Sequence, residues 1–269
     1  MDAVLFAELL GLGLVSGFLA GLLGIGGGML MVPLLTALLS QRGVGADMSV
    51  KMAIATSMAT IMFTSLSSVR AHHKLGAVRW DIVRHMAPGI LVGGLAAGAG
   101  VFALVKGAAL ALIFAAFVSF SGLQMLRDKK PSPTRQLPER AGLVGVGSGI
   151  GLLSGLVGAG GGFVSVPFMT WCNVPMHMAV ATSAALGFPI ALANTFGYLL
   201  GGWELEPALP GALGYLYLPA LAVIATASVL MAPLGARAAH AMDVKQLKRA
   251  FAGLLFLLAG YMLWKGLTG

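Results

Sequence analysis

The sequence predicts an all-α integral membrane protein built from two repeats of inverted topology. Three observations lead to this prediction. First, the 269 residues are 58% hydrophobic and only 10% charged, which is too little charge for the surface of a soluble domain of this length. Second, several nearly uncharged runs of about 20 residues are long enough to cross a hydrocarbon core of roughly 30 Å as helices. Third, two sequence motifs each occur twice, once in each half of the chain.

The first repeated motif is a glycine cluster inside an apolar stretch. Residues 17–33 read GFLAGLLGIGGGMLMVP and residues 151–167 read GLLSGLVGAGGGFVSVP, with ten of the 17 positions identical. An apolar helix, 4–23 or 141–157, precedes each cluster, and an apolar segment of only ten to twelve residues follows it. Segments this short rarely span a bilayer. We therefore expect each half to begin with a helix, a glycine-rich break and a half-helix that returns to the starting face.

The second repeated motif lies in the next helix of each half. Residues 52–59 (MAIATSMA) match residues 178–185 (MAVATSAA) at six of eight positions. These motifs belong to predicted spans 49–69 and 177–200. The remaining predicted spans are 85–104, 107–126, 213–236 and 249–266. Each half is thus a hairpin of a helix and a half-helix plus three transmembrane helices, about eight full spans and two half-helices in all.

The distribution of Lys and Arg predicts the orientation. The segment RDKKPSPTRQLPER, residues 127–140, cannot continue a helix and separates a first repeat, 1–126, from a second, 141–269. This linker and the loops 70–84 and 237–249 hold 13 of the 17 basic residues. Placing all three in the cytoplasm makes equivalent elements of the two halves run in opposite directions. Both termini then lie on the outer, periplasmic side of the membrane.

The glycine clusters predict a binding site for an anion. Glycine lets the backbone leave helical geometry, and the half-helix that follows directs free N–H groups and a partial positive charge toward the bilayer centre. The candidate binding residues are Gly24, Gly26, Gly27 and Gly28 in the first break and Gly158, Gly160, Gly161 and Gly162 in the second. Two alternatives stay open. Such glycines also serve close helix packing, and unwound carbonyls can bind a cation or another small solute.

Polar side chains in the helices after the breaks are the next candidates. Thr56 and Ser57 occupy the same positions as Thr182 and Ser183, so their hydroxyl groups are expected to line an oxyanion site. Asn194 follows in the second of these helices, at a depth where a polar side chain is unfavourable unless it is used or paired. The alternative for the hydroxyls is a hydrogen bond to the carbonyl four residues earlier in the same helix.

The paired sequences GLLGIGGGMLMVP and GLVGAGGGFVSVP, each followed by an A-T-S helix, resemble the sulfite exporter TauE/SafE family of membrane permeases. The resemblance extends over nearly the whole chain, including the basic linker and the final helix preceded by LKRAFAG. It implies a multi-pass transporter of the bacterial inner membrane. The implied substrates are small sulfur-containing anions such as sulfite, thiosulfate or organosulfonates, moved by alternating access in the direction of export.

Other functional classes are disfavoured by the residues that are missing. Met29 and Phe163 stand where a dinucleotide-binding GxGxxG motif needs glycine, and no P-loop lysine follows. A single cysteine, Cys172, excludes an intramolecular disulfide and a cysteine-rich metal site. No HExxH motif is present, so we expect no enzyme activity, no metal and no other cofactor. The expected partners are the anionic substrate and the lipid bilayer, with no nucleic acid.

The nine acidic residues all lie at termini, in loops or near helix ends. A proton-coupled carrier usually keeps a carboxylate or a histidine at membrane depth. Unless Glu8 is drawn inward, we therefore expect an anion to move down its own gradient and under the membrane potential, without a carboxylate relay. Protonation of the substrate itself is the alternative route to proton coupling.

Overall fold

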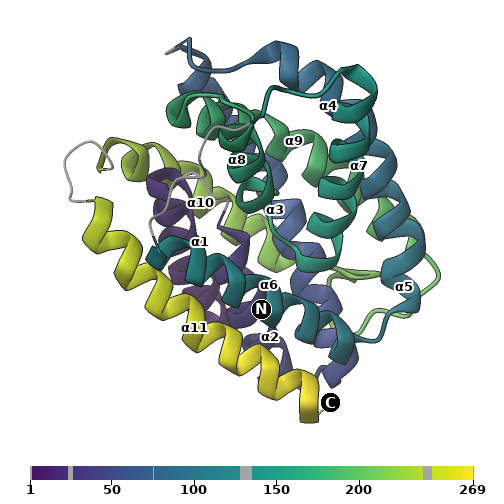
Figure 1. Ribbon diagram of the computed structural model, residues 1–269. Helices are drawn as coiled ribbons and strands as arrows, with labels where there is room; N and C mark the ends of the chain where they lie inside the picture. Colours follow the sequence, from purple (N-terminus) through teal and green to yellow (C-terminus); the bar gives the residue numbers. More distant parts are fainter. Residues whose placement is uncertain (1, 24–26, 75, 128–134, 239–243, 269) are drawn as a thin grey trace.

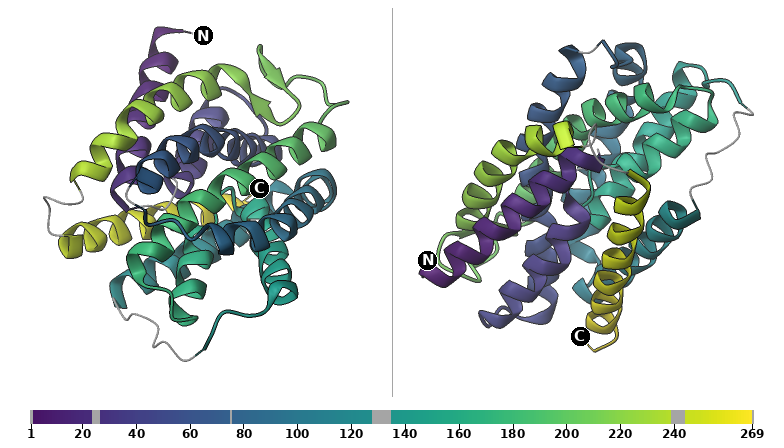
Figure 2. Two further views of the ribbon diagram at one scale, coloured as in Figure 1. Left: turned by 90° about the horizontal axis from the view of Figure 1, so that it is seen from above. Right: turned by 90° about the vertical axis from the view of Figure 1, so that its left-hand side faces the viewer.

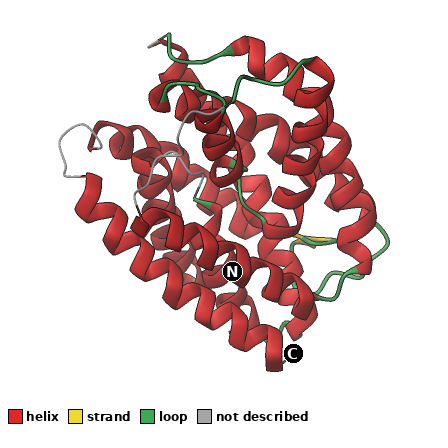
Figure 3. Cartoon of the chain, viewed as in Figure 1, coloured by secondary structure: helices red, strands yellow, loops and turns green. Residues whose placement is uncertain are grey.

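The computed structural model describes residues 2–23, 27–74, 76–127, 135–238 and 244–268. These residues form a bundle of long helices (Figures 1 and 3). Eight of the described helices are long and apolar enough to cross a membrane, which confirms the predicted all-α membrane class. The β-structure among the described residues is one pair of two-residue antiparallel strands, β1 (Ala212–Leu213) and β2 (Leu216–Tyr217).

The helices follow the predicted order closely. The first half contains α1 (Ala3–Leu23), α2 (Gly28–Gln41), α3 (Ala46–Lys74), α4 (Trp80–Leu95), the π-helical turn η1 (Ala96–Val101), α5 (Phe102–Leu104) and α6 (Gly107–Arg127). The second half contains α7 (Arg140–Val157), α8 (Gly162–Trp171), α9 (Met176–Gly201), α10 (Leu218–Ala238) and α11 (Val244–Thr268). The two short helices, α2 with 14 residues and α8 with 10, directly follow the glycine clusters.

Four predicted boundaries were wrong by five residues each. Helices α4 and α11 begin earlier than the predicted spans 85–104 and 249–266, at Trp80 and Val244. Helix α3 continues five residues past the predicted end at residue 69, because no helix-breaking residue occurs before Gly76, which has a φ of 63°. The predicted span 213–236 begins late, at residue 218, because the apolar residues before it form the β1–β2 hairpin. Gly211 and Gly214 have positive φ values of 87° and 55° there, which a tight turn requires and which glycine adopts without steric cost.

Helices α3 and α9 pack together, while α1 packs on α10, α4 on α7 and α6 on α11 (Figures 1 and 2). The α1–α10 and α4–α7 pairs are equivalent when the two halves are exchanged. Both depend on glycine: a Cβ added to Gly17 would collide with the backbone of Ser228, and one added to Gly151 would collide with the backbone of Ile90. Backbones at this separation are the usual basis of tight helix association in membranes.

The two ends of the bundle differ in what they carry. The start of α1 and the end of α11 lie toward the same end, and the loop between α3 and α4 lies at the opposite end (right-hand view in Figure 2).

The tryptophans are exposed and lie at or near helix ends, as is typical of residues at membrane interfaces. They are Trp80, Trp171, Trp203 and Trp264.

Candidate functional site

The two glycine-rich breaks lie against each other. Gly27 and Gly161, at equivalent positions, immediately precede α2 and α8 with left-handed φ values of 69° and 73°. A Cβ added to Gly28 would collide with the carbonyl oxygen of Gly158 and lie 3.2 Å from the Cα of Ala159. The start of α2 therefore touches the backbone of the second break. Gly24 and Gly26, two further predicted site residues, lie outside the described residues.

A cavity adjoins the second break. Its volume is about 30 Å³, which is room for about two water molecules, since one needs roughly 10–15 Å³ on this measure. The cavity is lined by Ala20, Gly21, Ile61, Thr64, Ser65, Ser68, Gly160, Ser183, Ala184, Gly187 and Ala232. None of these side chains is charged, so the polar groups that face the cavity are hydroxyl groups and backbone atoms.

Neutral hydrogen-bond donors are available at the cavity. The Ser165 hydroxyl donates to Oγ of Ser183 over 2.8 Å, which leaves the hydroxyl proton of Ser183 free to donate elsewhere. The amides of Gly162 and Phe163, at the start of α8, have no acceptor among the described residues; they follow Gly160 in the chain, although neither residue lines the cavity. Free amides of this kind at a helix N-terminus, together with the helix dipole, favour negative charge.

The two predicted threonines tie the halves together. Thr56 Oγ1 accepts a hydrogen bond from the backbone N–H of Tyr217 over 3.0 Å, and Thr182 Oγ1 accepts one from the N–H of Arg79 over 3.0 Å. Tyr217 and Arg79 each stand immediately before the first residue of the long helix they precede, α10 and α4. Both threonine side chains are fully buried. Each threonine thus anchors the start of a helix from the other half, and neither lines the cavity.

We expect Thr56→Val to lower stability without removing volume. The substitution leaves the buried N–H of Tyr217 without its acceptor, at a cost of about 1–3 kcal/mol, so the thermal unfolding midpoint of the detergent-solubilised protein should fall. Thr56→Ser keeps the acceptor and should lose much less. Thr60→Val is the matched control, because Thr60 is equally buried but donates only to its own helix, at the carbonyl of Thr56. A Thr60→Val variant as unstable as Thr56→Val would contradict the anchoring role.

Two more predicted residues also make structural contacts. Asn194 Nδ2 donates to the carbonyl of Gly151 over 3.2 Å and to that of Ile190 over 2.8 Å, so the side chain joins α9 to α7. Ser57 donates to the carbonyl of Gly158 over 3.3 Å. Of the predicted site residues that the structure describes, Gly160 and Ser183 line the cavity.

The sequence reasoning missed three hydroxyl residues of the cavity wall: Thr64, Ser65 and Ser68. A signal was present, because they follow Ser57 at spacings of seven, eight and eleven residues, which place them on one side of a helix. These hydroxyl residues are not repeated in the second half, where the equivalent positions of α9 are Ile190, Ala191 and Asn194. The repeat therefore did not point to them.

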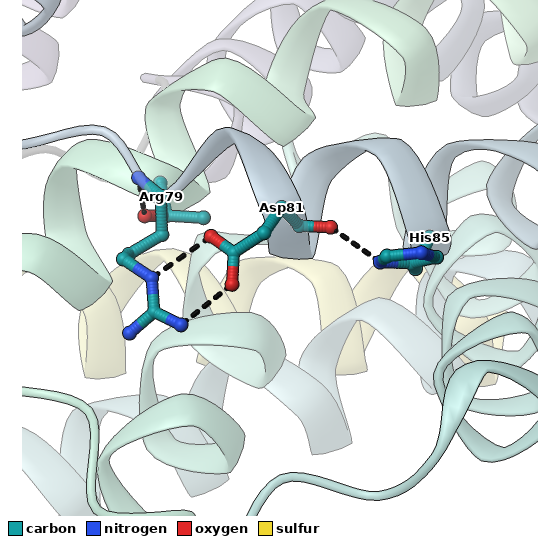
Figure 4. A network of polar contacts seen from close by, with 4 residues as sticks. Arg79, Asp81 and His85 are labelled. Atoms are coloured by element: carbon teal, nitrogen blue, oxygen red, sulfur yellow. Dashed lines mark hydrogen bonds and ion pairs between the residues drawn. The ribbon is translucent and has the colours of Figure 1, made fainter.

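The turn into α4 is fixed by an ion pair. Arg79 Nε lies 2.8 Å from Asp81 Oδ1, and Arg79 Nη2 lies 2.5 Å from Asp81 Oδ2 (Figure 4). His85 Nδ1 lies 2.7 Å from the carbonyl oxygen of Asp81. The hydrogen bonds that Arg79 donates to the Asp81 carboxylate raise the pKa of Arg79, so the guanidinium stays positive at every physiological pH. Arg79, which carries this positive charge, is also the residue whose backbone N–H donates a hydrogen bond to Thr182 Oγ1.

Comparison with known proteins agrees with this architecture. The profile of the family described as "Sulfite exporter TauE/SafE" matches residues 9–262. The chain belongs to the sulfite exporter TauE/SafE family. A relative from Haemophilus influenzae, a "probable membrane transporter protein", is 36% identical over 256 residues, covering 94% of this chain and 96% of the relative.

Other relatives carry the same description. A probable membrane transporter protein of Methanocaldococcus jannaschii is 28% identical over 254 residues, covering 93% of this chain and 92% of the relative. The probable membrane transporter protein YunE of Bacillus subtilis is 30% identical over 235 residues, covering 77% of this chain and 84% of the relative. No solved structure gives a significant match. The chain is therefore a membrane transporter and not an enzyme.

Proposed function

We propose that this TauE/SafE protein is a secondary transporter for small sulfur-containing anions such as sulfite, thiosulfate or organosulfonates. The substrate binds at the cavity between the second glycine break, α3 and α9, which has room for about two water molecules in this conformation and must widen to admit an organosulfonate. The observation that carries the proposal is the composition of this cavity, which combines the break at Gly160 with the hydroxyl groups of Ser65, Ser68 and Ser183 and has no charged side chain. Neutral donors at a helix N-terminus suit a small anion that must bind and also leave.

The proposal includes the inverted topology of the two repeats, 1–126 and 141–269, in the bacterial inner membrane. The positive charge supports it, because the basic loop between α3 and α4 lies at the end of the bundle opposite the two termini. The paired contacts support it as well. Thr56 with Tyr217 and Thr182 with Arg79 are the same hydrogen bond with the halves exchanged, as a two-fold relation between repeats requires.

Transport would be driven by the substrate gradient and the membrane potential. Among the described residues no carboxylate lines the cavity, so the chain offers no obvious proton carrier there. A potential that is negative in the cytoplasm drives anions outward, at about 2.3 kcal/mol per charge and 100 mV. Export is therefore the favoured direction for a singly charged anion.

One observation favours a second candidate, a carrier for a cation. The carbonyl oxygen of Gly160 lies 4.0 Å from the position of a Cβ on Gly187, and both residues line the cavity. A carbonyl oxygen at an unwound segment is the usual ligand of a transported Na⁺. The test of the proposed function must therefore include a cation.

The test is flux through purified protein in liposomes. We expect entry of radiolabelled sulfite that is inhibited by thiosulfate and ethanesulfonate, is insensitive to chloride and responds to an imposed K⁺ diffusion potential. Uptake of ²²Na⁺ without any sulfite flux would replace the anion proposal by the cation carrier. Accumulation driven by a pH gradient at fixed substrate charge would contradict the uncoupled mechanism.

Removal of the Ser183 hydroxyl should weaken substrate binding. A hydrogen bond to a charged group contributes about 1.5–3 kcal/mol, so Ser183→Ala should raise the dissociation constant about 10- to 100-fold. The measurement is isothermal titration with ethanesulfonate. Ser121→Ala is the matched control, because Ser121 is equally buried and donates only to the carbonyl of Phe117 in its own helix. Equal affinities of the two variants would contradict a role for Ser183 in binding.

A further inference from the structure

Helices α3 and α9 occupy equivalent places, but they differ on the side that continues from the cavity. On α3, residues Ser65, Ser68 and His72 lie on one side of the helix at spacings of three and four. Ser65 is 7% exposed, whereas Ser68 and His72 are both partly exposed. A polar face thus leads from the buried cavity wall toward the end of α3 and becomes more accessible along its length.

The same positions of α9 are closed. An offset of 126 residues makes Ala191, Asn194 and Tyr198 the counterparts of Ser65, Ser68 and His72, and all three are 0% exposed. The Tyr198 hydroxyl donates to the carbonyl of Gly155. Its ring lies 4.4 Å from the ring of Phe102, centroid to centroid. Where α3 offers a polar face, α9 therefore offers a packed one.

The aromatic packing around Tyr198 extends toward the loop before α10. The ring of Phe102 meets that of Tyr215 edge-on, with centroids 5.3 Å apart. Lys51 Nζ lies over the Tyr215 ring, 5.9 Å from its centroid, and 3.2 Å from Asp47 Oδ2. Tyr198, Phe102 and Tyr215, which we call the aromatic seal, thus form one packed group, and none of them lines the cavity.

We propose that in this conformation the substrate reaches and leaves the cavity only along the Ser65–Ser68–His72 face of α3, and that the aromatic seal closes the opposite route. The inference rests on the proposed function in taking the cavity as the substrate site. It adds the route, the end of the bundle at which the route opens and the residues that close the other end.

The distribution of charge agrees with an anion using this route. At the closed end, Arg42 is paired with Asp2 and Lys51 with Asp47, whereas Lys106 and Lys265 have no ion pair among the described residues. At the open end Lys74, two residues after His72, is exposed, and the ion pair found there among the described residues is the one between Arg79 and Asp81. Unpaired positive charge at the mouth of a route raises the local concentration of anions and their rate of entry.

The route can be tested by one-sided thiol labelling. The background is Cys172→Ser, and the reagent is the membrane-impermeant anion 2-sulfonatoethyl methanethiosulfonate, applied to liposomes of known orientation. Lys74→Cys and Glu204→Cys, at exposed positions, define the two faces. We expect Ser68→Cys to react from the Lys74 face at least about tenfold faster than from the Glu204 face, since a minor open state is populated at up to about 10%.

Two variants test the closed end. Asn194→Cys, the counterpart of Ser68→Cys, should react from neither face. Adding Tyr198→Ala to Ser68→Cys should speed labelling from the Glu204 face, whereas Tyr198→Phe keeps the ring and should leave labelling one-sided. Three results for Ser68→Cys would overturn the route: equal labelling from both faces, faster labelling from the Glu204 face, or no labelling from either face. These results do not depend on whether Tyr198→Ala folds.

Protection by substrate separates this inference from the proposed function. Ethanesulfonate should slow the labelling of Ser68→Cys, and chloride should not. One-sided labelling that ethanesulfonate never slows would leave the route standing and reject the anion function. Two-sided labelling with full protection would reject the route and keep the function.

Discussion

Gly161→Val should abolish substrate binding and transport while leaving a folded protein in the membrane. Gly161 has a φ of 73°, and a Cβ there would lie 2.5 Å from Cδ1 of Ile190 and 3.2 Å from Oγ of Ser154. The left-handed conformation alone costs an L-residue roughly 1–2 kcal/mol, and a β-branched side chain tolerates it worst. The backbone before α8 must then shift, together with the amides that we propose bind the anion.

The measurement is sulfite flux in liposomes, with size-exclusion chromatography to show that the variant is folded. Gly27→Val, at the equivalent position of the first break, should behave in the same way. Gly149→Val is the matched control, since Gly149 lies in α7 with nothing within 4 Å of its Cβ position. Normal flux through Gly161→Val would remove the glycine break from the mechanism.

The second large effect concerns folding. Gly93→Leu should prevent α4 from packing on α7, because a Cβ on Gly93 would collide with the carbonyl oxygen of Ser148 and lie 2.9 Å from its Cα. Overpacking between two rigid backbones costs about 3 kcal/mol or more when neither can move. We expect aggregated protein after detergent extraction, measured as loss of the monodisperse elution peak.

The control for this folding defect is Gly145→Leu, on α7 and exposed, whose Cβ position has nothing within 4 Å. It should elute as the wild-type protein does. A monodisperse, heat-stable Gly93→Leu variant would show that the close contact between α4 and α7 is not required for folding.

Much of the fold could be predicted from local properties of the sequence. The length of an apolar run limits whether it can span a bilayer, so the eight long helices and the short helices α2 and α8 followed from the positions of glycine and charge. The β1–β2 hairpin could not be predicted in this way. Its residues are apolar, and only the positive φ of Gly211 and Gly214 distinguishes them from the start of a helix.

The candidate site was harder to predict, because repetition marks equivalent positions without saying what they contact. Thr56 and Thr182 recur because each holds the amide before a helix of the other half, a contact between residues 161 and 103 positions apart that no local pattern reveals. Ser65 and Ser68 line the cavity but occur in one half only. We propose that this difference between the halves opens a route on one side only. The same difference means that Ser65 and Ser68 are not repeated in the sequence, so the repeat did not point to them.

The position of a bound anion tests the central claim most directly. Selenite is close to sulfite in shape and charge, and its selenium scatters anomalously. An anomalous difference map from crystals grown with selenite should show one dominant peak within hydrogen-bonding distance of Ser183 and next to Gly160. A peak only beside Lys74 or Arg79, with nothing between α3 and α9, would place recognition at the surface and contradict the cavity as the binding site.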